Sequence, residues 1–308
     1  QVRRLLADGA DAGQVAGALG RRRDHFPLRV AVVADDAGQA VERLDAYLTD
    51  PSAEIPGVVA GRGEPRGRVA FVFPGQGGQW LGMARGLLGV APVFTDAVTR
   101  CAEALRAHVD WDLVEVLAGR AGDDWLRAVH MVQPALWAMS VGLAELWRAA
   151  GGEPDVVVGH SQGEVAAATI AGILSHHDAA AVIARRSRLA ARTSGRGRML
   201  AVALDADSAR TSLEGFEELV SLAADNGPTS CVLSGDTEAV LTLKELLEAD
   251  DVFCRLVDVD YASHSPQMDE LTEDLLAELA EVRPGPGRIP LMSTVRLASL
   301  AGPEMDAG

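Results

Sequence analysis

Cysteine is scarce in this 308-residue sequence, and its spacing excludes a disulfide framework. The three cysteines, Cys101, Cys231 and Cys254, are far apart and form no Cys-x-x-Cys pair. An odd number of isolated cysteines is typical of a reduced protein in which such side chains are buried. We therefore expect a cytoplasmic protein without disulfides, and we predict no metal site.

Positive charge and long apolar runs are also lacking. Lysine and arginine total 28 against 44 acidic residues, which gives a formal net charge of −16, and Lys244 is the single lysine. This balance argues against binding nucleic-acid phosphates, which requires a basic face, although a local arginine could still bind a carboxylate on a small substrate. No apolar stretch approaches the roughly 18 residues of a membrane span. We therefore predict no nucleic-acid partner and no membrane contact.

The first 66 residues differ from the rest and predict a small α/β unit. They begin with neither the apolar core of a signal peptide nor an initiator methionine, so we expect them to be part of a longer polypeptide. One helical pattern covers residues 1–20, an apolar strand covers 28–36, and a second helical pattern covers 37–50. The glycine, proline and arginine content of residues 57–68 is typical of a linker.

A strand and a glycine-rich loop open the larger part of the chain. The β-branched and aromatic run of residues 68–73 predicts a buried strand that ends at Pro74. Helical patterns continue to about residue 150, and the last of them has Pro134 near its first turn. The core is therefore expected to begin with a strand, a loop and several helices.

A second strand and two helices follow. The strand is predicted over residues 155–159, and a helix begins at about Gln162. Another helical pattern covers residues 174–193, where Ser175 and Asp178 resemble a capping box.

Residues 198–259 predict a separate, inserted subdomain. Their patterns alternate as strand, helix, strand, strand, helix and strand, with a turn signal at residues 226–228 between the two central strands. This β-α-β-β-α-β order is that of ferredoxin-like folds. A helical pattern returns after residue 260, and residues 296–308 show no periodicity.

The pentapeptide Gly159-His160-Ser161-Gln162-Gly163 fits the pattern Gly-x-Ser-x-Gly between a predicted strand and a predicted helix. Flanking glycines permit the sharp, strained turn that exposes a serine oxygen. The backbone N–H of Gln162 would then face a developing oxyanion, which the helix dipole also stabilises. A structural turn is the alternative, but the strand-to-helix context favours a nucleophile.

A serine nucleophile needs a base, and an acidic substrate needs a cation. Of the seven histidines, His264 lies on a predicted loop between a strand and a helix, where catalytic residues often occur. A surface or capping role is its alternative. Arg186 could clamp a substrate carboxylate through two hydrogen bonds, or it could share a solvated helix face with Arg185 and Arg188.

The loop sequence FPGQGGQ over residues 73–79 lacks the lysine and Ser/Thr of a phosphate-binding P-loop. A glycine-rich loop after a strand can instead present a backbone N–H as a second oxyanion donor. Gln76 is the candidate, and a purely structural turn is the alternative.

Seven motifs occur in one order along the chain: FVFPGQGGQW, VQPALWAMSVGLAELW, GHSQGEVAAATIAGILS, ARRSRLAA, RMLAV, NGPTSCVLSGD and YASHS. Together they resemble an acyltransferase domain of a modular type I polyketide synthase and, more broadly, malonyl-CoA:acyl carrier protein transacylases. The resemblance covers about residues 68–295. Residues 1–66 resemble the linker that joins a ketosynthase to its acyltransferase.

The resemblance implies an α/β fold with an α/β-hydrolase-like core and an inserted ferredoxin-like subdomain. The core would comprise residues 67–197 and 260–308, the subdomain residues 198–259, and the small α/β linker unit residues 1–66. The enzyme would be an acyltransferase of polyketide biosynthesis that binds no cofactor of its own. Its partners would be an acyl-CoA, an acyl carrier protein bearing phosphopantetheine, and a ketosynthase in the same polypeptide.

The resemblance also implies a role for each candidate residue. Ser161 would attack the thioester, and His264 would take its proton and return it to the departing CoA thiol. Arg186 would hold the free carboxylate of the extender unit, while the backbone N–H groups of Gln76 and Gln162 stabilise the oxyanion. The phosphopantetheine thiol would then attack the acyl-serine.

Two features of the resemblance bear on the extender unit. In this family, a glutamine after the nucleophile and the sequence Tyr-Ala-Ser-His go with methylmalonyl, where malonyl enzymes usually carry His-Ala-Phe-His. Gln162, Tyr261 and Ser263 therefore predict methylmalonyl-CoA, because a serine leaves more space than a phenylalanine for an α-methyl group. Malonyl or ethylmalonyl specificity is the alternative, since one methyl group is worth about 1–3 kcal/mol of discrimination.

Family members continue beyond the equivalent of Gly308 with a strand and a His-Pro loop whose backbone carbonyl orients the catalytic histidine. We therefore expect residues 1–308 by themselves to lack that carbonyl and part of the core sheet, and not to be fully active.

Two other classes of function compete with a transferase. A serine hydrolase or thioesterase also uses Gly-x-Ser-x-Gly, with Asp236, Asp258 or Asp260 as the available acid, but it has no need of a buried arginine. A non-catalytic scaffold between synthase domains is the other alternative. The joint presence of Ser161, His264 and Arg186 argues against a decayed site.

Overall fold

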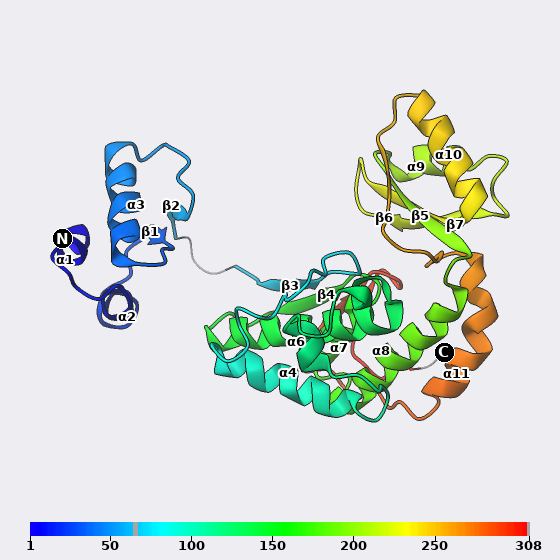
Figure 1. The fold of residues 1–308 in the computed structure, drawn as a ribbon, viewed down its shortest axis with the longest axis horizontal. Helices are drawn as coiled ribbons and strands as arrows, with labels where there is room; N and C mark the ends of the chain where they lie inside the picture. The colour runs from blue at the N-terminus through cyan, green and yellow to red at the C-terminus, as the bar shows by residue number, and fades with distance from the viewer. Residues whose placement is uncertain (64–66, 307–308) are drawn as a thin grey trace. The chain divides into compact units, whose positions relative to one another are not determined.

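The computed structural model describes residues 1–63 and 67–306, which divide into two compact units, the first ending at Gly67 (Figure 1). The first unit contains α1 (Val2–Ala7), α2 (Ala12–Arg22), β1 (Leu28–Val32), α3 (Ala37–Thr49) and β2 (Val58–Arg62). β1 and β2 pair antiparallel. Arg3 of α1 donates to both carboxylate oxygens of Asp45 in α3 at 2.8 Å. The first unit is therefore the small α/β unit that the sequence predicts.

Two details of the first unit differ from the prediction. The helical pattern over residues 1–20 forms two helices, because Gly9, at a φ of 91°, turns the chain between them. Residues 58–62, predicted as linker, form β2, because β-branched Val58 and Val59 favour pairing with β1. Residues 64–66, where the predicted linker continues and the predicted domain boundary falls, lie outside the described residues.

A four-stranded sheet and its helices form the core of the second unit. The elements before the insertion are β3 (Ala70–Phe73), α4 (Pro92–Leu105), α5 (Leu113–Leu117), η1 (Asp124–Arg127), α6 (Val129–Ala149), β4 (Val156–Gly159), α7 (Gly163–Ala171), α8 (His176–Ala190) and η2 (Ala191–Thr193). Those after it are η3 (Pro266–Leu271), α11 (Thr272–Leu279), β9 (Leu291–Ser293) and β10 (Ala298–Leu300). The last two residues of the predicted core, 307–308, lie outside the described residues.

The core sheet has the strand order β10-β9-β4-β3, in which β3, β4 and β9 are parallel and β10 is antiparallel. The apolar run of β4 is typical of a parallel strand covered on both faces. Because β3 and β4 are parallel, the loops that follow them leave the same edge of the sheet. The glycine-rich loop after Phe73 therefore lies beside the serine turn after Gly159.

Helix α6 packs through the centre of this core, and it begins earlier than the sequence predicts. Trp137 is fully buried and donates its indole N–H to the Thr169 hydroxyl at 3.0 Å. The helix starts at Val129, so Pro134 lies inside it and not near its first turn. Proline removes one backbone hydrogen bond there, but the apolar side chains of Val129 and Val132 are buried in the same turns, which offsets that loss.

The cap predicted for α8 is confirmed. Ser175 Oγ accepts from the Asp178 N–H at 3.0 Å and donates to the Asp178 carboxylate at 2.7 Å. This fixes the start of the helix that carries Arg186.

The inserted strands form a second sheet with its own apolar core. The elements are β5 (Gly197–Val202), α9 (Ala206–Thr211), β6 (Val220–Asp225), β7 (Cys231–Asp236), α10 (Thr237–Ala249) and β8 (Cys254–Leu256). All pairings are antiparallel in the order β6-β7-β5-β8. Leu200, Leu233 and Leu243 are buried between sheet and helices. This is the predicted ferredoxin-like arrangement. By contrast, β10 falls in residues without periodicity, because three residues are too few to show alternation.

Candidate active site

Ser161 lies in the turn between β4 and α7 with a φ of 53°, in the left-handed region. Such a conformation costs a non-glycine residue about 1 kcal/mol or more and persists only where the surroundings fix it. A Cβ at Gly159 would lie 2.3 Å from the Glu164 backbone nitrogen, and one at Gly163 would lie 2.3 Å from the Phe73 carbonyl oxygen. The two glycines are therefore required for the tight elbow that exposes the serine.

His264 comes from the loop after the ferredoxin-like sheet and meets the serine. Its Nε2 lies 2.8 Å from Ser161 Oγ. Its backbone also has a positive φ, 60°, and its carbonyl accepts a hydrogen bond from Ser221 Oγ of β6 at 3.2 Å. Desolvation of the ring, followed by the charges of Arg186 and His160, lowers the pKa of His264 below its usual value near 6.5. A neutral imidazole is thus available to accept the serine proton.

Arg186 is the one arginine of its cluster on α8 that lines the cavity beside His264. Arg185 and Arg188 both contact Glu278 of α11. Arg186 instead donates to the side-chain oxygen of Gln133 at 2.5 Å, and no acid within residues 1–63 and 67–306 pairs with it. Burial lowers the pKa of the guanidinium. A desolvated cation without an anionic partner favours binding of an anion.

The candidate specificity residues line the same space as the arginine. A cavity of about 380 Å³ is bordered by Gln133, Arg186, Tyr261, Ser263 and His264, among others. The structure therefore brings together the candidate base His264, the candidate carboxylate-binding Arg186 and the Tyr-Ala-Ser-His segment.

Gln162 is placed differently from the other specificity candidates. Its side chain is only 3% exposed, donates to the Pro74 carbonyl at 3.4 Å, and is not among the residues that line the cavity. The backbone N–H groups of Gln162 and Gln76, the candidate oxyanion donors, have no hydrogen-bond acceptor within the described part of the chain. Neither N–H group is therefore engaged within the described residues, as a candidate oxyanion donor requires.

Gln133 is a site residue that the sequence reasoning missed. Its amide oxygen accepts from Arg186, and its amide nitrogen lies 3.4 Å from Gln76 Oε1 and from the Tyr261 hydroxyl. Tyr261 in turn donates to Gln76 Oε1 at 2.9 Å. Gln133 therefore links the arginine, the glycine-rich loop and the specificity segment. Its place in the motif VQPALW was the available signal.

A second cavity, of about 730 Å³, reaches Ser161 and His264. Ser161 and His264 line it together with Ala223 of β6 and with Val295 and Leu297, which follow β9. The exposed side chains of Val295 and Leu297 give this cavity an apolar wall. His264 lines both cavities, so each of them gives access to the serine–histidine pair.

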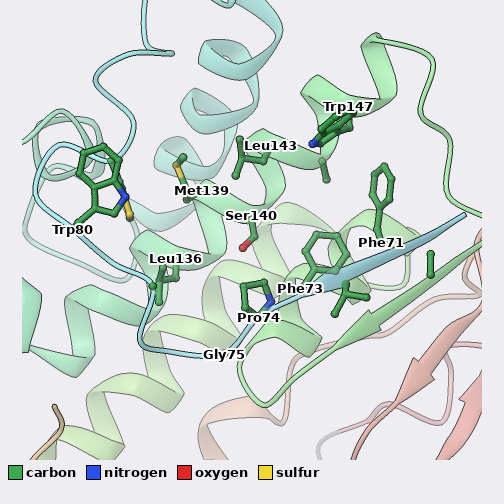
Figure 2. A pocket seen from close by; sticks show the side chains of 15 residues that line it. Phe71, Phe73, Pro74, Gly75, Trp80, Leu136, Met139, Ser140, Leu143 and Trp147 are labelled. Carbon is green, nitrogen blue, oxygen red and sulfur yellow. The ribbon is translucent and has the colours of Figure 1, made fainter. Parts of the chain in front are cut away.

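A third cavity, of about 510 Å³, lies between β3 and α6 (Figure 2). Figure 2 shows Phe71 and Phe73 of β3 and Leu143 and Trp147 of α6 along its walls. None of the described residues that border it is an acid, a base or a cysteine. Ser140 contributes a hydroxyl to this wall, but no histidine, acid or lysine among the described lining residues accompanies it to act as its base.

No group of three or more histidine, cysteine or acidic side chains within residues 1–63 and 67–306 is arranged to hold a metal ion. In the same part of the chain, no helix is both long and apolar enough to cross a membrane. Cys101 is buried, which raises the pKa of its thiol to about 12.

Comparison with known protein families matches residues 70–308 to the acyl transferase domain family. The chain belongs to this family. The match includes Ser161, Arg186 and His264. It confirms the enzyme class predicted from the sequence, an acyltransferase.

Relatives of this acyltransferase domain include modular polyketide synthases. Polyketide synthase GfsB of Streptomyces halstedii is 46% identical over 311 residues, which cover 99% of this chain but 6% of the relative. The acyltransferase domain from module 8 of the salinomycin polyketide synthase is 43% identical, with a TM-score of 0.91. The match covers 100% of this chain and 74% of that domain's chain. The malonyl CoA-acyl carrier protein transacylase from Coxiella burnetii is 26% identical, with a TM-score of 0.71, over 77% of this chain and 76% of its own. These likenesses confirm the predicted fold class and the resemblance to acyltransferase domains of modular polyketide synthases.

Proposed function

We propose that this chain loads an α-carboxyacyl extender unit, methylmalonyl, from CoA onto Ser161 and transfers it to the phosphopantetheine thiol of an acyl carrier protein. The observation that carries the proposal is the 2.8 Å contact between Ser161 Oγ and His264 Nε2, beside a cavity lined by Arg186, which has no acid partner among the described residues. A serine activated by a neighbouring base can accept and pass on an acyl group, and the arginine selects an acyl group with a free carboxylate.

In the acylation step, His264 Nε2 accepts the hydroxyl proton as Ser161 Oγ bonds to the thioester carbonyl carbon. The carbonyl electron pair moves onto oxygen, where the unengaged N–H groups of Gln76 and Gln162 would stabilise it. When the tetrahedral intermediate collapses, its carbon–sulfur bond breaks and the CoA sulfur takes the proton from His264. The products are free CoA, a neutral imidazole and an acyl-serine ester.

The substrate carboxylate would bind Arg186. Its guanidinium is desolvated, and the one hydrogen-bond partner that the described residues give it is the neutral side chain of Gln133. A charge-assisted pair with a carboxylate is stronger than a neutral hydrogen bond. Binding there would also fix the thioester relative to Ser161, which lowers the entropic part of the barrier.

The choice of methylmalonyl rests on the cavity wall. Ser263 contributes a small side chain beside His264, and Tyr261 is held by its hydrogen bond to Gln76. A phenylalanine at position 263 would take up space that an α-methyl group needs. Malonyl and ethylmalonyl remain the competing extender units, because the discrimination available from one methyl group is about 1–3 kcal/mol.

The transfer step would use the second cavity. Its apolar wall at Val295 and Leu297 suits a pantetheine arm, which must bring its thiol to the acyl-serine. We propose that the carrier protein docks against the ferredoxin-like subdomain, residues 198–259, whose β6 lines this cavity. In this scheme residues 1–66 link the domain to a ketosynthase, residues 67–197 and 260–308 form the catalytic core, and the enzyme works in the cytoplasm.

A serine hydrolase is the competing enzyme, and the surroundings of His264 disfavour it. Asp236 caps α10, and Asp260 accepts a hydrogen bond from the Ser194 hydroxyl. No carboxylate within the described residues contacts the His264 ring, so the acid of a hydrolase triad is not supplied there. A non-catalytic scaffold is disfavoured by the formed contact between Ser161 and His264.

The test is the intact mass of the protein after it is mixed with malonyl-, methylmalonyl- and ethylmalonyl-CoA in competition. We expect an adduct of methylmalonyl mass on the parent chain and none on Ser161→Ala. Addition of an acyl carrier protein should move that mass to the carrier. Release of the free acid with no adduct on the carrier would favour the hydrolase. A malonyl or ethylmalonyl adduct would show that the enzyme selects that extender unit and not methylmalonyl.

A further inference from the structure

Glu164 and Thr294 form a hydrogen-bonded clasp across the serine elbow. Thr294 follows β9 directly, and its hydroxyl lies 2.9 Å from the carbonyl oxygen of Gly159, two residues before the nucleophile. The same hydroxyl lies 3.2 Å from Glu164 Oε1, three residues after the nucleophile, and the Thr294 N–H donates to that oxygen at 2.7 Å. One residue therefore joins both flanks of Ser161.

The neighbouring Ser293 strengthens this connection. Ser293 is 2% exposed, and its hydroxyl donates to Glu164 Oε1 at 3.0 Å. It also accepts from the N–H groups of Val295 and Arg296, at 3.2 and 3.0 Å, which sets the turn after β9. In the sheet, Ser293 is the register partner of Gly159. The clasp is thus anchored in the core sheet on one side and in the first turn of α7 on the other.

The elbow needs such an anchor because Ser161 is held at a φ of 53°. A strained backbone relaxes unless surrounding contacts determine it, and a relaxed turn would move Oγ away from His264 Nε2. We propose that Glu164 and Thr294 are positioning residues that hold Ser161 in its reactive conformation. The proposal rests on Ser161 being the nucleophile of the proposed function.

The geometry also indicates what Glu164 contributes. All three of its hydrogen bonds from β9 and Thr294 end on a single oxygen, Oε1. An amide oxygen can accept the same bonds, so the acceptor and not the negative charge should matter. Glu164→Gln is therefore expected to behave like the parent, whereas Glu164→Ala removes the acceptor. Thr294→Val removes the hydroxyl but keeps the backbone bond to Glu164.

The experiment measures the rate at which a fluorophosphonate probe labels Ser161. In that reaction Oγ bonds to phosphorus, fluoride leaves, and His264 takes the proton, so the rate reports the serine–histidine geometry without any acyl-CoA. We expect Glu164→Ala and Thr294→Val to slow labelling roughly ten- to a hundredfold. Glu164→Gln should stay within about twofold of the parent, and Thr294→Ser should restore the rate lost in Thr294→Val.

Two exposed residues of α4 provide matched controls, Glu103→Ala and Thr99→Val, since the Thr99 hydroxyl bonds only within its own helix. Thermal melting of each variant measures its folded fraction. If Glu164→Ala does not fold, Thr294→Val and Thr294→Ser still decide the question. Labelling as slow in Glu164→Gln as in Glu164→Ala, or unchanged in Thr294→Val, overturns the proposal. Normal probe labelling without loading by any acyl-CoA would overturn the proposed function but leave the clasp intact.

Discussion

His264 Nε2 lies 2.8 Å from Ser161 Oγ, and both residues have a positive φ, 60° and 53°. The pair joins a turn of the core sheet to the loop that leaves the ferredoxin-like sheet. Neither conformation is one that serine or histidine prefers in isolation. The fold therefore stabilises two strained positions, and the result is a contact between the proposed nucleophile and the proposed base.

The pH dependence of Ser161 reactivity should follow His264. Its pKa lies below 6.5 because of desolvation, Arg186 and His160, and the base must be neutral to act. Reactivity should therefore stay constant through neutral pH and fall only as pH drops through that lowered pKa. Arg186→Gln removes one cationic neighbour, so the midpoint should move to higher pH. Fluorophosphonate labelling from pH 4.5 to 8 measures this without involving substrate binding, and a midpoint that stays fixed or moves lower in the variant would contradict the assignment.

Arg186→Ala should change which acyl groups are loaded. Loss of a charge-assisted pair with the substrate carboxylate costs about 1.5–3 kcal/mol, so kcat/KM for methylmalonyl-CoA should fall roughly ten- to a hundredfold or more. Propionyl-CoA, which lacks the carboxylate, should be affected much less. Arg188→Ala is the matched control, because Arg188 is on the same helix but pairs with Glu278. An equal loss for both substrates would show that the arginine supports the fold and not recognition.

The double change Tyr261→His with Ser263→Phe should shift selection toward malonyl-CoA. A phenylalanine at position 263 would fill part of the 380 Å³ cavity, and the loss of Tyr261 removes a hydrogen bond to Gln76. The preference for methylmalonyl over malonyl should fall by roughly 10- to 200-fold, the range available from one methyl group. Competition loading read by intact mass gives the ratio directly, with each single variant beside the double one. A constant ratio in all three variants would remove Ser263 from the specificity assignment.

The elements with strong local signals were predictable from the sequence. The turn around Ser161 needs glycines at fixed positions, and the Ser175 cap needs a partner three residues away, so both appear as short patterns. The alternation of strands and helices over residues 198–259 likewise predicted the second sheet. Elements whose bounds are decided by tertiary packing were not predictable in this way. Helix α6 starts five residues before Pro134 because its first turns are buried, and β2 forms only by pairing with β1.

The residues of the candidate site also differ in whether a local sequence signal predicts them. Ser161 carries a local signature, whereas His264 and Arg186 were singled out firmly only by the ordered motifs of a family, because no local rule relates residues so far apart. Gln133 was missed since its role depends on three side chains from different elements. The residues of the cavity wall were only partly predictable. Gln162 was expected to contribute to specificity because it follows Ser161 in sequence, but its side chain instead donates to the Pro74 carbonyl.

The contact between Gln133 and Arg186 yields a test in which the arginine itself stays in place. Gln133 Oε1 accepts from Arg186 Nη1 at 2.5 Å, and the glutamine is 3% exposed. In Gln133→Glu a carboxylate would occupy this position and neutralise the guanidinium, because a buried cation pairs with the nearest anion. The variant should therefore lose preference for methylmalonyl-CoA over propionyl-CoA about as strongly as Arg186→Ala. Gln133→Met, which keeps the volume but supplies no charge, should retain more of that preference. If Gln133→Glu still prefers the carboxylated substrate, then Arg186 does not bind its carboxylate, because a neutralised guanidinium could not supply the selection.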